Sequence, residues 1–169
     1  MVGKRPPQAD KGSHDMDIKA ILVATDFSDS SGAAFQAAKS MGERFGAKLV
    51  LLHVIHQNTV ARLAEFLRVE PEALLPEMRE RAQLQLGEFL KRVKPEKLEV
   101  DSMVAVGLPF QEIAVVARDL AVDLVVMGGY GRGGRGPIEK IFFGSTAEKV
   151  VRLLPCPVLC VPPAVSGEQ

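Results

Sequence analysis

The sequence has few of the features that mark secreted, membrane-bound or nucleic-acid-binding proteins. No apolar run approaches the roughly 20 residues that a membrane-spanning helix needs, and the first residues contain no apolar signal-peptide core. Lysine plus arginine and aspartate plus glutamate both number 21, so no overall field attracts nucleic acid or an anionic membrane. We therefore expect a cytoplasmic protein without a nucleic-acid or membrane partner.

Cysteine is also scarce, since the chain has only Cys156 and Cys160. If they lie on one strand, their spacing separates them by roughly 13 Å, which is too far for a disulfide bond. The neighbouring sequence offers no histidine or further cysteine to complete a metal site. We expect both side chains to be small buried hydrophobic groups, and no metal ion held by protein side chains.

The residues that are present suffice for one folded domain. The chain has 169 residues, of which 47% are hydrophobic, and this suits a single domain of ordinary size. Residues 1–16 are polar, contain proline and glycine and show no periodicity, so we expect a disordered tail. The folded domain is expected to cover residues 17–165.

Short apolar runs alternate with amphipathic segments along the chain. The runs have the composition of strands buried on both faces, and they cover residues 18–24, 49–55, 98–106, 124–127 and 158–161. Helical spacing is found at about 30–45, 82–93, 109–120 and 147–154. This alternation predicts an α/β fold with an open, doubly wound, five-stranded parallel sheet and helices on both faces.

The stretch 57–76 has the least regular pattern. Its apolar residues indicate one short helix carrying Val60, Leu63, Ala64 and Leu67. We expect Pro71 and Pro76 to break the helical path, because proline lacks an N–H and its ring clashes with the preceding turn.

Glycines crowd into the segment that follows the fourth expected strand. Six of them fall within nine positions: Gly128, Gly129, Gly131, Gly133, Gly134 and Gly136. The last helix then opens with Gly144, Ser145 and Thr146. Glycine lets backbone N–H groups converge on an anion, and a helix N-terminus adds free N–H groups and a positive dipole end. Positive side chains come from the same segment: Arg132, Arg135 and Lys140. The pattern predicts a phosphate-binding site.

The same glycines also fit other interpretations. A flexible linker before a capped helix is one alternative, because Ser145 and Glu148 fit a capping box that needs no ligand. The spacing Gly129-x-Gly131-x-x-Gly134 matches a dinucleotide fingerprint, but about ten residues separate it from the helix and no acidic residue ends the last strand. A P-loop is excluded because the sequence has no Gly-Lys-Ser or Gly-Lys-Thr.

Thr25 and Asp26 end the first expected strand, at the carboxyl edge where doubly wound folds bind ligands. A carboxylate there can accept hydrogen bonds from ribose hydroxyl groups, whereas the alternative is that Asp26 caps the first helix. We expect His53 to be a buried structural histidine and His56 to face solvent. Neither has a nucleophile nearby in the sequence, and we expect no catalytic residue.

Six short motifs are spread along the chain: Val23–Ser28 (VATDFS), Leu51–Ile55 (LLHVI), Val106–Pro109 (VGLP), Met127–Gly134 (MGGYGRGG), Gly144–Val150 (GSTAEKV) and Cys156–Val161 (CPVLCV). Together they resemble the universal stress protein family over nearly all of residues 17–163. The resemblance implies a Rossmann-like fold of the adenine nucleotide alpha hydrolase type with strand order 3-2-1-4-5. It also implies a nucleotide-dependent binding or signalling module of the stress response. No fixed general base, metal-ligand cluster or pair of arginine and glutamine for hydrolysis stands out in the sequence, so we expect at most slow ATP hydrolysis.

The same resemblance implies a site for ATP or a related adenine nucleotide, with Mg²⁺ or Mn²⁺ bridging the phosphates. The residues so implied are Ala24, Thr25, Asp26, Val54, Met127, Gly128, Gly131, Arg132, Gly134, Gly144, Ser145 and Thr146. By resemblance Val54 packs on the base, and Asp26 and the backbone beside it meet adenine and ribose. The resemblance also implies a homodimer formed through the last strand, by Val158, Leu159, Cys160 and Val161.

The glycine spacing can be aligned with the family in two ways. Counted from Gly131 and Gly134, nine residues precede Gly144, as in ATP-binding members. Aligned on the end of the strand at Gly128, the corresponding interval is twelve residues. The second alignment is physically better, because strand geometry fixes Gly128 while loops absorb insertions. We therefore expect a loop three residues longer than usual, with the additional residues within 132–137.

The alternative function is that of a nucleotide-free interaction protein of the same fold, whose dimer surface is its function. The glycine and serine pattern argues against this alternative, and the longer loop argues for it. A nicotinamide-dependent dehydrogenase domain is disfavoured because the chain has no substrate domain.

Overall fold

The protein is described by a computed structural model that covers residues 17–95, 97–129, 144–153 and 156–162. Its strands are β1 (Ala20–Thr25), β2 (Lys48–His56), β3 (Val100–Gly107), β4 (Leu124–Gly128) and β5 (Val158–Val161). Its helices are α1 (Asp29–Phe45), α2 (Gln57–Leu67), α3 (Pro71–Val93), α4 (Pro109–Asp119) and α5 (Ser145–Leu153). The predicted tail 1–16 lies outside the described residues.

The strands form one sheet in the order β3-β2-β1-β4-β5, and every pair is parallel. This confirms the predicted doubly wound α/β fold and the strand order that the motifs implied. β1 lies at the centre, where Ile21, Leu22 and Val23 have no exposed surface. β3 and β5 are the edge strands.

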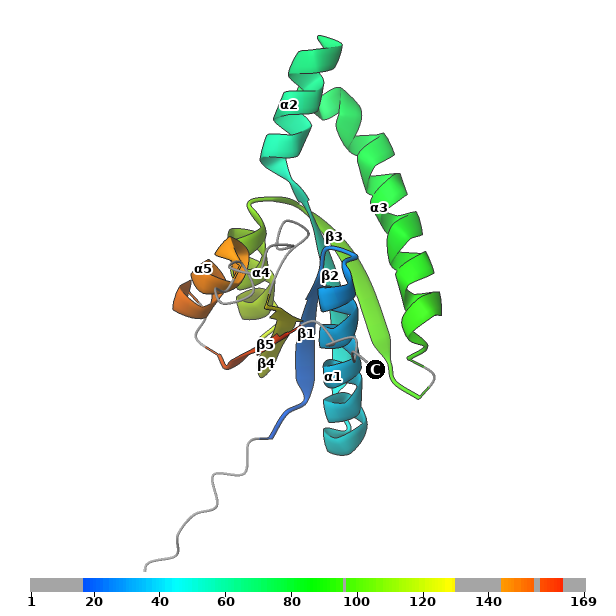
Figure 1. Ribbon diagram of the computed structural model, residues 1–169, viewed down its shortest axis with the longest axis vertical. Helices are drawn as coiled ribbons and strands as arrows, with labels where there is room; N and C mark the ends of the chain where they lie inside the picture. Colours follow the sequence, from blue (N-terminus) through cyan, green and yellow to red (C-terminus); the bar gives the residue numbers. More distant parts are fainter. Residues whose placement is uncertain (1–16, 96, 130–143, 154–155, 163–169) are drawn as a thin grey trace, which may run out of the picture.

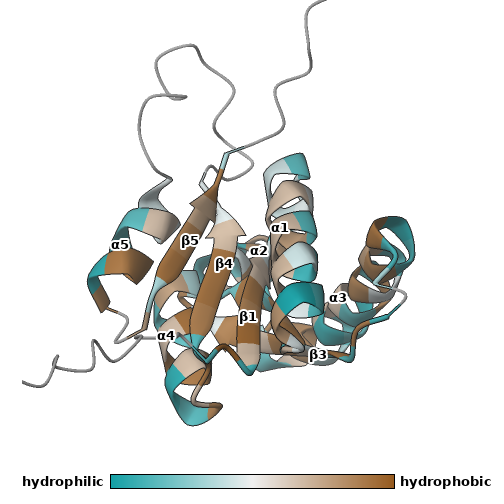
Figure 2. Cartoon of the chain, turned by 90° about the horizontal axis from the view of Figure 1, so that it is seen from below, coloured by the Kyte–Doolittle hydropathy of each residue, from teal (hydrophilic) through white to brown (hydrophobic). Residues whose placement is uncertain are grey.

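Helices cover both faces of the sheet (Figure 2). On one face α1 and α3 pack against the strands through Phe35 and Phe89. On the other face α4 and α5 pack through Ile113 and Val150. Successive residues of β1 contribute alternately to the two cores, because side chains alternate across a strand.

The segment 57–76 is more regular than its sequence indicated. α2 ends at Leu67, and Arg68 takes a left-handed conformation that stops the helix. α3 begins at Pro71, which starts this helix rather than breaking it, since the N–H of the first helical residue has no intrahelical partner. The two helices form an antiparallel pair that extends beyond the sheet (Figure 1).

Pro76 lies inside α3, so the break expected there is wrong. A proline in a helix interior costs about 3 kcal/mol or more, and apolar packing on both sides of it offsets this cost. Leu75 and Met78 pack against a small cluster formed by Ile55, Val60 and Ala82.

Among the described residues no helix is both long and apolar enough to cross a membrane.

The two cysteines are half-buried beside the core that faces α4 and α5. Burial raises the pKa of both the Cys156 and the Cys160 thiol, because the charged thiolate loses solvation. Both therefore stay protonated at neutral pH and pack as small hydrophobic groups, although they are half-buried rather than buried as expected.

Candidate functional site

The site lies where the winding direction of the sheet reverses. From β1 the chain turns towards β2, whereas β4 and β5 lie on the opposite side of β1. The carboxyl ends of β1 and β4 are neighbours, because Ala24 pairs with Met127. Doubly wound folds bind ligands at such a point, and the predicted residues of both strand ends therefore meet there.

Three of the predicted residues share one face of the sheet. Ala24 of β1, Val54 of β2 and Met127 of β4 all pack on the core that also contacts α4 and α5. Met127 is buried, while Ala24 and Val54 are half-buried. Together they give an apolar surface at the carboxyl edge of the three strands.

Thr25 points to the opposite face, towards α1. Its hydroxyl accepts a hydrogen bond from the Phe27 N–H at 3.0 Å and donates to the Ser31 hydroxyl at 3.0 Å. Ser31 in turn donates to the Ser28 carbonyl at 2.9 Å. These bonds fix the turn between β1 and α1, so the Thr25 side chain has a structural task.

Asp26 lies in this turn with one carboxylate oxygen occupied. The N–H of Ser28 donates to Oδ1 at 3.1 Å, and the Ser28 hydroxyl donates to the same oxygen. The other oxygen, Oδ2, makes no hydrogen bond with any residue that the structure describes. Asp26 is thus held in place through Oδ1, and Oδ2 can accept a hydrogen bond from a ligand.

The alternative role of Asp26 as the cap of α1 is wrong. The N-cap is Ser28, whose hydroxyl accepts from the Ser31 N–H at 3.2 Å. Ser28 takes the extended conformation that an N-cap requires, so it is placed for this role and Asp26 is not.

Gly128, at the end of β4, touches the first turn of α1. A Cβ added at this position would lie 2.5 Å from the Ser30 hydroxyl and 3.1 Å from the Ser30 carbonyl carbon. The packing of α1 alone therefore requires glycine there. The contact between Ser30 and Gly128 could not be predicted from the sequence because it joins distant parts of the chain.

The end of β4 and the start of α5 are held together by backbone hydrogen bonds. Gly129 donates to the Val161 carbonyl at 2.8 Å, and Gly144 donates to the Gly129 carbonyl at 2.8 Å. Gly144 is therefore brought to the end of β4, as a phosphate site would require. The predicted residues Gly131, Arg132 and Gly134 lie outside the described residues.

Among the residues that the structure describes, no side chain caps the first turn of α5. The Gly144 carbonyl accepts from the Glu148 N–H at 3.1 Å, which makes Gly144 the N-cap and places Ser145 inside the helix. The capping-box alternative is wrong, because the Glu148 carboxylate instead contacts Arg152 at 2.8 Å. The N–H groups of Ser145, Thr146 and Ala147 have no intrahelical partners, so this helix end can accept an anion.

The comparison with known proteins follows from this geometry. A model of the universal stress protein family matches residues 17–162. The chain belongs to the universal stress protein family. Universal stress protein YxiE of Bacillus subtilis is 33% identical over 147 residues, which cover 83% of this chain and 97% of the relative. Universal stress protein MJ0577 of Methanocaldococcus jannaschii is 28% identical over 155 residues, covering 85% of this chain and 94% of the relative.

Solved structures of universal stress proteins have the same fold. The MJ0577 structure matches with a TM-score of 0.74 at 29% identity, covering 89% of this chain and 99% of that one. A universal stress protein from Archaeoglobus fulgidus, solved in complex with dAMP, matches with a TM-score of 0.59 at 20% identity. That match covers 86% of this chain and 98% of the other, and at this identity the likeness is one of fold.

His53 and His56 of this universal stress protein have structural contacts. His53 is half-buried rather than buried; its Nδ1 lies 2.9 Å from the Thr25 carbonyl oxygen, and its ring stacks on Phe27. His56 does more than face solvent, because its ring nitrogen accepts from the Asn58 N–H at 3.2 Å and caps α2. The sequence did not reveal this cap, since histidine is not among the usual N-cap residues.

Proposed function

We propose that this universal stress protein binds ATP, or a related adenine nucleotide, where β1 and β4 end. The base lies against Val54, beside Ala24 and Met127, with the backbone at Thr25 nearby, and the ribose hydroxyl groups donate to Asp26. The phosphates lie at the first turn of α5, bound by Gly144, Ser145 and Thr146, with Gly128 at the adjoining strand end. Gly131, Arg132 and Gly134 are proposed to complete the phosphate site.

One observation carries this proposal. Gly144 is held against Gly129 by a 2.8 Å hydrogen bond, which places the uncapped first turn of α5 at the end of β4. Three N–H groups and a positive dipole end there have no acceptor from their own helix. A nucleotide phosphate would supply that acceptor. The dAMP in the Archaeoglobus fulgidus relative supports an adenine nucleotide as the ligand class.

A divalent ion, Mg²⁺ or Mn²⁺, is proposed to bridge the phosphates rather than to bind protein side chains. In the described part of the chain no group of three or more histidine, cysteine or acidic residues could hold a metal ion. The nucleotide would therefore bring its own metal, which neutralises phosphate charge.

Titration calorimetry with ATP and Mg²⁺, and with GTP as the control ligand, tests the proposal. A matched pair of variants at Ser145 tests the site. Proline is well tolerated at the first helical position, so Ser145→Pro removes one N–H donor while keeping α5. Ser145→Ala removes the hydroxyl and keeps that donor.

We expect Ser145→Pro to bind ATP about tenfold more weakly than Ser145→Ala, since a hydrogen bond to a charged group contributes about 1.5 to 3 kcal/mol. Equal affinities in the two variants would remove the first turn of α5 from the site. Wild-type protein that binds no adenine nucleotide would overturn the proposal and leave the nucleotide-free interaction protein as the function.

We also propose a homodimer formed through β5. Val158, Leu159, Cys160 and Val161 form an edge strand, and Leu159 is 37% exposed. The carbonyl groups of Pro157 and Val161 accept bonds from β4, so those of Val158 and Cys160 point outward, where a second strand can pair.

The proposed location is the cytoplasm, which microscopy of the tagged protein would check.

Cys160→Pro tests the dimer, because it removes an outward N–H without removing a bond to β4. We expect this variant to be monomeric at concentrations where Cys160→Ala is dimeric, as measured by sedimentation velocity. A Cys160→Pro dimer of unchanged stability would place the interface elsewhere.

A further inference from the structure

Phe27 has a backbone conformation that its position in the chain does not explain. Its φ is 66°, in the left-handed region that bulky residues avoid. The other non-glycine residues with positive φ in the described ranges, Arg68, Lys94 and Ala121, all follow helix C-termini, where this conformation is common. Phe27 instead precedes a helix, between Asp26 and the N-cap Ser28. Strained backbone of this kind persists only where surrounding contacts hold it.

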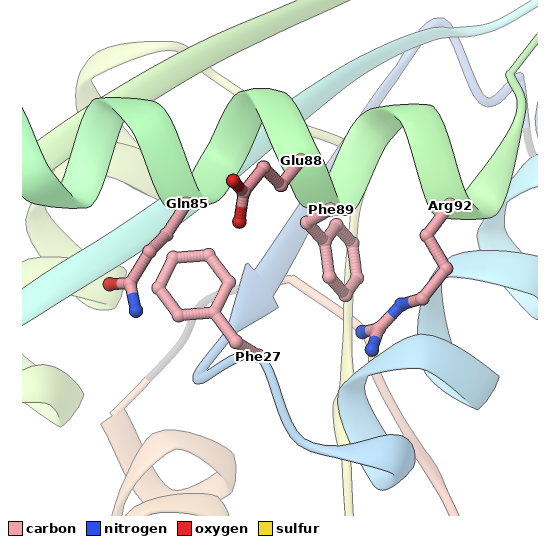
Figure 3. Close-up of a pocket in the computed structure, with 5 residues that line it drawn as sticks. All are labelled: Phe27, Gln85, Glu88, Phe89 and Arg92. Atoms are coloured by element: carbon pink, nitrogen blue, oxygen red, sulfur yellow. The ribbon is translucent and has the colours of Figure 1, made fainter.

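Those contacts come from two aromatic rings. The Phe27 ring stacks on His53 of β2, with centroids 4.3 Å apart and an interplanar angle of 28°. Its other neighbour is Phe89 of α3, at 6.1 Å in an edge-to-face arrangement. Phe89 is itself fixed in the core by an edge-to-face contact with Phe35 at 5.8 Å. Figure 3 shows the Phe27 ring lying against α3, beside Gln85 and Phe89.

The same rings also fix the residues on either side of Asp26. His53 bonds to the Thr25 carbonyl at 2.9 Å, and the Phe27 N–H donates to the Thr25 hydroxyl at 3.0 Å. The backbone before Asp26 is thus held through His53, and the backbone after it is held through the Phe27 ring. The free Oδ2 of Asp26 depends on this arrangement for its direction.

We propose that Phe27 is a positioning residue for the nucleotide site. Its ring, held between His53 and Phe89, keeps the turn in the conformation that directs the Asp26 carboxylate to the ribose hydroxyl groups. α3 lies on the face of the sheet opposite Val54. The contact between Phe27 and Phe89 of α3 would thus make ribose binding depend on packing on the opposite face of the sheet. This inference rests on the proposed function, and it concerns the ribose alone.

Two substitutions separate the ring from the backbone conformation. Asparagine adopts the left-handed conformation readily, so Phe27→Asn keeps φ accessible and removes the ring. Phe27→Tyr keeps the ring, and its hydroxyl has room in the hollow of about 270 Å³ lined by Gln85, Glu88 and Arg92. Phe66→Asn on α2 is the control, because Phe66 is 83% exposed and remote from the turn.

The probes are ATP and 2′,3′-dideoxy-ATP, each with Mg²⁺, and the measured quantity is the ratio of their affinities. Wild type, Phe27→Tyr and Phe66→Asn should prefer ATP, by about tenfold, since a hydrogen bond to a carboxylate is strong. Phe27→Asn should lose that preference while binding dideoxy-ATP almost as wild type does. Asp26→Asn should lose it too, and the double variant should lose no more than either single one.

A merely structural role for Phe27 predicts something different, namely an equal loss of affinity for both nucleotides. That result, or a full ribose preference in Phe27→Asn, would overturn the inference while leaving the proposed function intact. Wild type that binds neither nucleotide would overturn both. If Phe27→Asn does not fold, Phe89→Leu weakens the same contact from α3 and should reduce the ribose preference; an unchanged preference there would also overturn the inference.

Discussion

α1 and α5 both begin beside the neighbouring ends of β1 and β4, but their first turns are satisfied in opposite ways. In α1 the Ser28 hydroxyl accepts from the Ser31 N–H, and Ser28 itself is tied to Asp26. In α5 the N-cap is Gly144, which has no side chain to offer.

The difference separates a structural helix end from one that is open to a ligand. The polar groups of the turn before α1 bond to one another, through Thr25, Ser28 and Ser31. The N–H groups in the first turn of α5 have no acceptor within their own helix. The helix N-terminus of α1 thus stabilises this edge of the sheet, while the helix N-terminus of α5 can bind an anion.

The largest loss of stability is expected from a substitution at Gly128, where β4 meets α1. Gly128→Ala places a methyl group against the Ser30 backbone and hydroxyl. Overpacking of this kind costs about 1 to 3 kcal/mol, and we expect a loss near the upper end because a backbone atom is involved. Urea unfolding measures it.

The control for Gly128→Ala is the double variant with Ser30→Gly. It removes the hydroxyl and Cβ of Ser30, so part of the lost stability should return, and the non-additivity reports the contact. If the double variant is less stable by the sum of the two single losses, the requirement for glycine comes from something other than α1.

A smaller effect is expected from the two serines at the helix starts. Ser28→Ala removes the cap of α1 and should lower the free energy of unfolding by about 1 kcal/mol. Ser145→Ala removes a hydroxyl that caps no helix in the described part of the chain, and it should change the free energy of unfolding by less than about 0.5 kcal/mol. Thermal unfolding of both variants without nucleotide checks this, and equal losses would contradict the contrast between the two helix ends.

The fold could be predicted because its signals are local. Strands buried on both faces read as continuous apolar runs, and β5 has the expected bounds. α1 ends at Phe45, where the helical spacing in the sequence ends, and Gly46 follows in a left-handed conformation. The candidate site could be proposed from the sequence for the same reason, since a strand end can be located once its strand is recognised.

What could not be predicted depends on contacts between distant residues. Pro76 is tolerated because Leu75 and Met78 pack against other elements. Ser145 and Glu148 have capping-box spacing, yet the bond from Gly144 to Gly129 sets the helix start one residue earlier. The strained Phe27 has no sequence signal at all, because its partners His53 and Phe89 come from β2 and α3.

The hydrogen bond from Gly144 to Gly129 also bears on how this family can vary. It joins the two ends of the intervening segment, so residues can be added between them without moving either end of the site. The entropy of closing such a segment grows with the logarithm of its length, so going from 11 residues to the 14 of positions 130–143 costs only about 0.2 kcal/mol. The number of residues between Gly129 and Gly144 is thus nearly neutral in its effect on stability.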